Sequence, residues 1–318
     1  MKIQYSFEPK IWNTLLKTFS YSDYFHSFHY HEVFCKYVLK GAKPIIFYNN
    51  SFCLPLIYKK VRNTDYYDLT SVYGYNGILV KDDQNIETIL ENLIEFIGNH
   101  FTEIVTIFFR SYPFQKIVSE KYIQKNNTLA LIDLLDEKWP INLKQNEKRN
   151  ISKLKKNGAE VSVKKGIFEI NSFFNNYYDT MKRNKAENFY YFDESFIKEL
   201  LLGYNAKLYS IILNDKIISS AIFLVNKKVT HYYLGGTDSN YLKYSPLKLI
   251  IFEAFFNLKN VTEYINLGSG NESLRHFKIK MSNKNDDFYL IKHTFNKNIY
   301  KKLVRDFGSK DNFFPEYW

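Results

Sequence analysis

The stretch Lys207–Gly236, "KLYSIILNDKIISSAIFLVNKKVTHYYLGG", decides the fold of the C-terminal half of this chain. It contains three apolar runs rich in β-branched and aromatic residues, and the pairs Asn214-Asp215 and Asn226-Lys227 separate them. Such runs predict strands, and short polar pairs between them predict tight turns, so we expect three antiparallel strands. A helix from Leu247, a strand in "EYINLG", a short helix after Gly270 and a last strand in "FYLIKHTF" are predicted to follow.

The residues before this stretch predict one strand and two helices. The strand is "EVSVKK" (160–165), and apolar residues from Ile170 to Met181 recur at helical spacing. A second helix is predicted over about Glu194 to Leu202. The C-terminal half therefore reads as strand, two helices, three antiparallel strands, helix, strand, helix, strand.

The first half, from Ile3 to Leu134, repeats this order. Residues 44–61, "PIIFYNNSFCLPLIYKKV", predict a hairpin that turns at Asn49 and Asn50. Apolar residues from Ile86 to Ile97 predict an amphipathic helix. "EIVTIFF" (103–109) and "TLALIDL" (128–134) predict buried strands, with another helix expected between them. Two halves with the same order of elements indicate a duplicated α/β domain with mixed sheets.

We place the domain boundaries in the basic segment between the halves. The expected parts are an N-terminal domain (1–137), a connecting basic helix (138–158) that Pro140 starts and Gly158 ends, and a C-terminal domain (159–299). Residues 300–318 are expected to pack back on the N-terminal domain.

Charge and composition restrict the class of protein. The formal net charge of +11 favours an anionic partner such as tRNA, phospholipid headgroups or a nucleotide diphosphate, although a lysine-rich, AT-biased coding sequence is an equal explanation. No run approaches the about 18 apolar residues that cross a bilayer. The first ten residues lack the apolar core of a signal peptide, and Cys35 and Cys53 form no pattern, so we expect a cytoplasmic protein.

Six stretches, in order, resemble the Fem-type family of tandem GNAT-like acyltransferases. They are "SVYGYNGILV" (71–80), "TIFFRSYP" (106–113), "KRNISKLKKNGAEV" (148–161), "YYDTMKRNKAENFYYF" (177–192), "HYYLGGTDSNYLKYSP" (231–246) and "INLGSGNESLRHFKIKMS" (265–282). The resemblance implies two GNAT-like domains. In that fold the fourth and fifth strands splay apart and the acyl donor lies between them; here these strands would be "KVTHYYLGGT" (228–237) and "EYINLGS" (263–269).

The resemblance also implies an activity. Fem-type enzymes transfer amino acids from aminoacyl-tRNA to peptidoglycan precursors, so we expect an aminoacyl or acyl transferase that acts on an amine of a nucleotide- or lipid-linked cell-envelope glycan precursor. Transient contact with the inner membrane surface would follow from a lipid-linked acceptor. The alternatives are an acetyl-CoA-dependent N-acetyltransferase acting on an amino sugar in surface-polysaccharide synthesis, and a non-catalytic protein that binds RNA or an envelope partner.

Two family features are missing from the chain. The segment between the halves is too short for the helical arm that some members carry. GNAT proteins that bind acetyl-CoA carry a glycine-rich loop whose backbone amides hold the pyrophosphate, whereas "YLKYSP" (241–246) has no glycine. This favours an aminoacyl-tRNA donor over acyl-CoA; we expect no bound cofactor.

The catalytic candidates follow from the chemistry of acyl transfer. The reaction needs a deprotonated amine and a group that stabilises the oxyanion of the tetrahedral intermediate. In the family, the Phe-Lys pair after the glycine-rich loop is associated with the catalytic centre, and "HFKIK" places Phe277 and Lys278 there. Asp238 and Glu272 are the best-placed carboxylates for a general base, and Asp238 is the candidate. Either could instead cap a helix, which is the favoured role for Glu272. A base on the donor or the acceptor itself is also compatible with the sequence.

The remaining candidates are expected to bind substrates. Ser269 and Asn271 belong to the loop "GSGN", which lacks the glycines of a dinucleotide-binding turn and the Lys of a P-loop. Tyr232 and Tyr244 flank the expected donor cleft. The other candidates, for the acceptor, are Tyr73, Tyr75, Arg110 and Arg183.

We assign no metal site. His26, His29 and His31 lie close in sequence, but no Cys, Asp or second His cluster completes a coordination set.

Overall fold

The computed structural model describes residues 2–81, 85–117, 121–203, 205–311 and 313–318, and these form two compact units. The first unit comprises residues 1–127 and 287–318, and the second comprises residues 128–286. The chain therefore crosses from one unit to the other twice. None of the helices in the described ranges is long and apolar enough to cross a bilayer.

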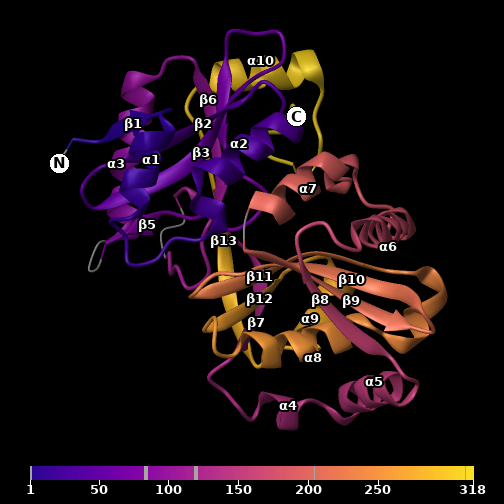
Figure 1. Cartoon of the computed structure of the whole chain (residues 1–318). Coiled ribbons are helices and arrows are strands. Elements are labelled where there is room, and N and C mark those ends of the chain that lie inside the picture. The colour runs from indigo at the N-terminus through magenta and orange to yellow at the C-terminus, as the bar shows by residue number, and fades with distance from the viewer. Residues whose placement is uncertain (1, 82–84, 118–120, 204, 312) are drawn as a thin grey trace. The chain divides into compact units, whose positions relative to one another are not determined.

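The first unit is a mixed sheet with helices on its faces (Figure 1). Its sheet order is β1-β2-β3-β4-β6-β13, with the short β5 beside β3, and the only parallel pair among these described strands is β4 with β6. The strands are β1 (Gln4–Ser6), β2 (Lys43–Tyr48), β3 (Phe52–Lys60), β4 (Tyr67–Thr70), β5 (Leu79–Val80), β6 (Ile104–Arg110) and β13 (Lys284–Thr294). The helices are α1 (Pro9–Leu16), η1 (Tyr24–His26), α2 (Phe28–Tyr37), α3 (Ile86–His100) and α10 (Lys297–Phe307).

The second unit has the same kind of sheet, in the order β8-β9-β10-β11-β12-β7. Here the parallel pair is β11 with β12. The strands are β7 (Ile123–Asp133), β8 (Glu160–Lys165), β9 (Ala206–Leu213), β10 (Lys216–Leu224), β11 (Val229–Thr237) and β12 (Tyr264–Gly268). The helices are α4 (Trp139–Asn142), α5 (Gln145–Lys156), α6 (Ile170–Arg183), η2 (Asn188–Tyr190), α7 (Glu194–Gly203), η3 (Ser239–Tyr244), α8 (Leu247–Leu258) and α9 (Glu272–Lys280). Figure 1 shows α6 and α7 on one face of this sheet, and α8 with α5 on the other.

The last strand of each half completes the sheet of the other half. Strand β7 ends the first half in sequence, but Asp133 pairs with Tyr264 of β12 in the second unit. Strand β13 ends the second half, but Leu290 pairs with Arg110 of β6 in the first unit. The sheet of each unit therefore contains a strand that comes from the other half of the sequence.

The central strand β10 is buried on both faces. In β10 the residues from Ser219 to Leu224 are all buried, because helices cover both faces of the sheet. One hydrophobic cluster joins β9 and β10 to α8 and to α5, whose Ile151 and Leu154 are buried. This packing positions β11, including the part beyond His231 that no longer pairs with β12.

The structure corrects two predicted elements. The segment expected to be one connecting helix contains two helices, α4 and α5, because the chain is extended at Leu143 and Lys144. The helix expected between β6 and β7 is absent from the described residues 111–117 and 121–122. There Gln115 closes a turn instead: its side-chain Oε1 accepts the Tyr112 N–H at 2.8 Å, and its Nε2 donates to the Ile78 carbonyl.

The C-terminal residues of the chain pack in the first unit. Leu303 of α10 and Tyr317 are buried there with Val61 and Val105. Tyr317 and Trp318 both donate hydrogen bonds of 2.8 Å to the carboxylate of Asp68, which is 1% exposed. Burial raises the pKa of Asp68, although these hydrogen bonds and Lys59 act in the opposite direction.

Candidate active site

The site forms where β11 and β12 stop pairing. The parallel ladder covers Val229 to His231 on β11 and Tyr264 to Asn266 on β12, although β11 continues to Thr237. At the last paired position the Asn266 side-chain amide lies 3.2 Å from His231 Nδ1, and its Oδ1 accepts the Gly268 N–H at 2.7 Å. This buried pair fixes both the end of the ladder and the turn that leaves β12.

A glycine-rich turn connects β12 to α9. Gly268 has φ +78° and Gly270 has φ +157°, backbone conformations that favour glycine. The Asn271 side chain caps α9 by accepting the Leu274 N–H at 3.0 Å, which is the role expected of an N-cap residue. Together, Gly270 and the Asn271 cap direct the chain into α9 from the end of β12.

Lys278 is the central polar residue of this site. Its side chain is buried, and its Nζ donates a 2.6 Å hydrogen bond to the Ser269 carbonyl. The same ammonium lies 5.6 Å from the centre of the Tyr232 ring on β11. Among the described residues no carboxylate forms an ion pair with Lys278, and burial lowers its pKa to about 7. The structure therefore brings together Lys278, Ser269 and Tyr232.

The aromatic candidates Tyr232 and Phe277 pack on the same hydrophobic cluster. Burial raises the pKa of Tyr232, so its hydroxyl stays protonated at neutral pH. A Cβ added to Gly235 would lie 2.1 Å from the Tyr232 hydroxyl oxygen, so the absence of a side chain at Gly235 makes room for that hydroxyl.

Asp238 lies at the open end of β11 and starts η3. Its carboxylate forms a 2.7 Å ion pair with Lys216 and accepts hydrogen bonds from the backbone and side-chain amides of Asn240, at 2.9 and 3.0 Å. Burial alone would raise the pKa of Asp238, but the Lys216 ion pair and the Asn240 amides outweigh it and lower the pKa. A lowered pKa makes a weaker base, so these contacts favour a capping role for Asp238.

Arg183 is engaged in holding the same end of β11. Its guanidinium contacts the Asp179 carboxylate at 3.1 Å, the Thr180 hydroxyl at 3.1 Å and the Thr237 carbonyl at 3.3 Å. Asp179 also accepts the Ser239 N–H at 2.9 Å. Arg183 therefore fastens α6 to the point where β11 ends.

Helix α6 approaches β11 so closely that the contact is between backbones. A Cβ added to Gly236 would lie 2.3 Å from the Asn176 carbonyl oxygen. We expect Gly236→Ala to destabilise the protein by about 1–3 kcal/mol, because neither backbone can move away without disturbing the sheet. Urea unfolding measures the loss of stability. Gly98→Ala in α3 is the control. A Cβ at Gly98 would contact Phe295 at an ordinary 3.6 Å, and alanine favours a helix. Equal unfolding free energies for the two variants would contradict the close packing.

The other three candidates lie in the first unit. The Tyr73 carbonyl accepts a 2.7 Å hydrogen bond from the Tyr30 hydroxyl, and the Tyr75 ring packs edge-on against Phe288 at 5.3 Å. The Arg110 guanidinium lies 5.2 Å from the Phe108 ring, and its carbonyl accepts the Gly77 N–H. The structure thus places Tyr73 and Tyr75 in one turn and Arg110 beside its end.

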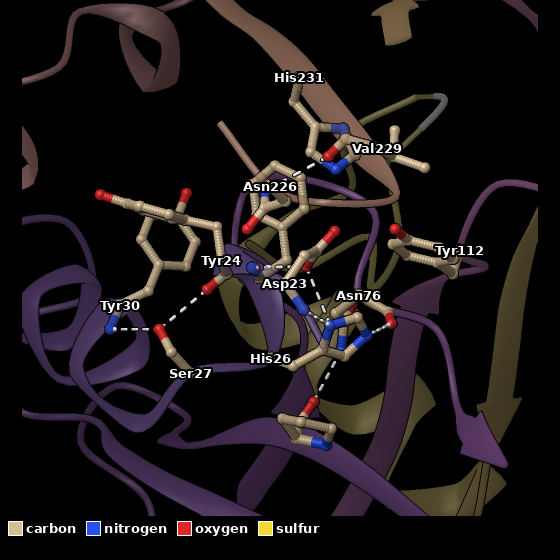
Figure 2. Close-up of polar contacts among 12 residues, drawn as sticks. Asp23, Tyr24, His26, Ser27, Tyr30, Asn76, Tyr112, Asn226, Val229 and His231 are labelled. Carbon is tan, nitrogen blue, oxygen red and sulfur yellow. Dashed lines mark hydrogen bonds and ion pairs between the residues drawn. The ribbon is translucent and has the colours of Figure 1, made fainter. Parts of the chain in front are cut away.

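The buried His26 contacts this turn. Figure 2 shows the His26 ring between Asp23 and the backbone of Asn76, with Nδ1 accepting the Asp23 N–H at 3.0 Å and Nε2 bonded to the Asn76 carbonyl. Burial lowers the pKa of His31 to about 3, against the effect of its hydrogen bond to Ser27. In the described part of the chain no group of three or more His, Cys, Asp or Glu is arranged to hold a metal.

Sequence reasoning missed three functional positions. They are His231 and Asn266, which hold the strands where they part, and Lys216, which neutralises Asp238. The available signal for the first two was a polar side chain inside each of two apolar strands, "VTHYYL" and "YINLG". No sequence signal paired Lys216 with Asp238, because the antiparallel pairing of β10 with β11 brings them together.

Comparison with known proteins identifies relatives of this fold. Residues 142–278 match the family described as "Acetyltransferase (GNAT) domain". The structure is similar to that of FemX, with a TM-score of 0.67 at 11% identity, covering 95% of this chain and 99% of that one. It is also similar to L-PGS from Bacillus licheniformis, with a TM-score of 0.59 at 12% identity, covering 93% of this chain and 95% of that one.

A third similar structure is a tandem GNAT protein from the clavulanic acid biosynthesis pathway, with a TM-score of 0.50 at 6% identity, covering 93% of this chain and 99% of that one. A search of curated proteins finds no match. The GNAT-like fold and the acyltransferase class expected from the sequence are thereby confirmed.

Proposed function

Since this chain is an acyltransferase with the tandem GNAT-like fold of the Fem-type proteins, we propose that it transfers an aminoacyl group from aminoacyl-tRNA to an amine of a cell-envelope glycan precursor. The observation that carries the proposal is the buried Lys278, whose Nζ lies 2.6 Å from the Ser269 carbonyl at the end of β12 where β11 and β12 part.

The chemistry follows from the position of this ammonium. The acceptor amine attacks the carbonyl carbon of the aminoacyl ester, and a C–N bond forms. The carbonyl oxygen becomes an oxyanion, which Lys278 stabilises in its protonated form. The C–O bond to the ribose then breaks, and the proton lost by the amine passes to the departing ribose hydroxyl.

The start of α8 supports a donor other than acyl-CoA. Pro246 has no N–H, and the amides of Lys248 and Leu249 already donate to the Ser245 and Pro246 carbonyls at 3.1 and 3.0 Å. A pyrophosphate bound at a helix N-terminus needs such amides to be available. The Lys248 side chain is also engaged, in a buried ion pair with Glu147 of α5.

The proposed acceptor is linked to a nucleotide or a lipid. The positive charge of the chain suits a diphosphate on the acceptor and an anionic inner membrane surface beside it. The second candidate is an acetyl-CoA-dependent N-acetyltransferase acting on an amino sugar, which the match to an acetyltransferase domain favours.

Offering both donors side by side tests the proposal. Purified protein is given tRNA charged with labelled amino acids and, separately, labelled acetyl-CoA, with UDP-linked and lipid-linked precursors as acceptors. We expect label to reach the acceptor from tRNA. Transfer from acetyl-CoA alone would overturn the proposed donor, and transfer from neither would overturn the proposed pair of donor and acceptor.

A further inference from the structure

A compact group of lysines and tyrosines covers the end of the second unit where β11 leads into η3. This basic-aromatic patch consists of Lys153, Lys216, Tyr241, Lys243 and Tyr244. Lys153 comes from α5, Lys216 begins β10, and the other three belong to η3. Three separate elements therefore contribute cations around two neighbouring rings.

Distances show that the patch is contiguous. The Tyr241 and Tyr244 ring centres are 6.3 Å apart. The ammonium groups of Lys153 and Lys243 lie 5.5 and 5.2 Å from the Tyr244 ring, and that of Lys216 lies 5.4 Å from the Tyr241 ring. All three distances are within the range of cation–π attraction.

Two of the three charges are available to a ligand. Lys216 is paired with Asp238 at 2.7 Å. Lys153 and Lys243 are exposed, and in the described ranges neither forms an ion pair with a carboxylate. The neighbouring Lys155, in contrast, is paired with Glu253 at 2.6 Å. The tyrosines are half-buried, so the core fixes their rings while part of each ring remains accessible.

The patch shares a hydrophobic cluster and a strand with the candidate active site. Tyr241 and Tyr244 pack against the same hydrophobic cluster as Tyr232 and Phe277. The open end of β11 runs directly through Asp238 into η3. Strand β11 therefore carries Tyr232 of the candidate site and leads at its end into the patch.

We propose that the basic-aromatic patch binds the single-stranded 3′ end of the donor RNA, with bases stacked on Tyr241 and Tyr244 and phosphates beside Lys153 and Lys243. Aromatic rings flanked by cations are the combination that binds single-stranded nucleic acid without sequence preference. Duplex RNA offers no unstacked bases to such rings. The inference rests on the aminoacyl-tRNA donor of the proposed function.

Binding of a short RNA tests the patch directly. The probe is a labelled single-stranded RNA of about eight nucleotides ending in CCA, and fluorescence anisotropy measures its affinity over a range of salt concentrations. We expect Tyr244→Ala to weaken binding about tenfold, and Tyr244→Phe to retain it because the ring is kept. Lys153→Gln with Lys243→Gln should reduce the slope of log affinity against log salt by about one to two.

Lys227→Gln provides the matched control, because Lys227 is exposed in the turn that precedes β11, at the opposite end of that strand. It should leave the affinity and the salt slope unchanged. Blunt duplex RNA of the same charge should bind more weakly than the single strand.

The outcomes separate this inference from the proposed function. If tRNA serves as donor but the patch variants bind RNA like the wild type, the assignment of RNA binding to the patch is wrong and the proposed function stands. If the wild type binds no RNA and transfers only from acyl-CoA, both are overturned. Equal loss of binding in the Lys227 control would also contradict the patch, because it would indicate a general effect of charge.

Discussion

Replacing Lys278 with methionine is expected to lower kcat about 100- to 1,000-fold, the range measured when one stabilising donor is removed from an oxyanion site. Methionine keeps most of the buried volume but cannot donate to an oxyanion or to the Ser269 carbonyl. Steady-state kinetics with the donor that proves active measures the effect. Lys280→Met, two residues further along α9, is the matched control and should retain activity.

The pH dependence of the rate supplies a second readout of Lys278. Burial lowers its pKa to about 7, so the ammonium loses its proton as the pH rises above 7. We expect kcat to fall on that side of the profile if the charged form is the active one. Lys278→Arg keeps its charge to far higher pH, so any activity that remains in this variant should lack the decline near pH 7.

As the pH rises above 7, the unfolding free energy of the wild type should increase, whereas kcat should fall. In the unfolded chain a lysine has a pKa of about 10.4, so between pH 7 and 10 the unfolded state binds more protons than the folded state. The unfolding free energy of the wild type should therefore rise with pH by up to about 1.4 kcal/mol per pH unit in this window, apart from the contributions of other groups. Lys278→Met should lack that increment. If the methionine variant is fully active, or if its stability follows the wild-type slope, Lys278 does not have the role assigned here.

Cutting the chain between its two sequence halves is expected to abolish folding of the first half. A fragment of residues 1–137 lacks β13, whose Ile291 belongs to the core of the first unit, and it lacks α10 and the Tyr317 and Trp318 hydrogen bonds to Asp68. It would expose the edge of β6 and leave a buried carboxylate without two of its donors. Circular dichroism and urea unfolding should show no cooperative transition.

A second variant, which keeps the whole first unit, provides the comparison. Residues 1–127 can be joined to residues 287–318 through a Gly-Ser linker of about eight residues. The linker is short because the two segments already meet near the ends to be joined, where the Lys292 N–H donates to the Tyr122 carbonyl at 2.9 Å. We expect this chain to unfold cooperatively. Cooperative unfolding of the 1–137 fragment would show instead that the first half is independent of β13.

The sequence by itself determined most of the elements and their order, apart from the connecting helix and the helix expected between β6 and β7. Polar pairs such as Asn214-Asp215 and apolar runs such as 216–225 are local signals, so the three antiparallel strands β9, β10 and β11 were predicted correctly. The residues of "INLGSGNESLRHFKIKMS" likewise placed a glycine turn, a capped helix and Lys278 at the end of β12. These patterns act over a few residues, and tertiary packing did not alter them.

Only the tertiary structure decided which strands share a sheet and what surrounds each charge. The sequence gives no signal that β7 pairs with β12 and β13 with β6, because strand pairing depends on partners more than a hundred residues away. The burial that lowers the pKa of Lys278, and the Lys216 ion pair that lowers the pKa of Asp238, arise in the same way. A side chain's chemistry at a site depends on its desolvation and on neighbours from other elements, and folding supplies both.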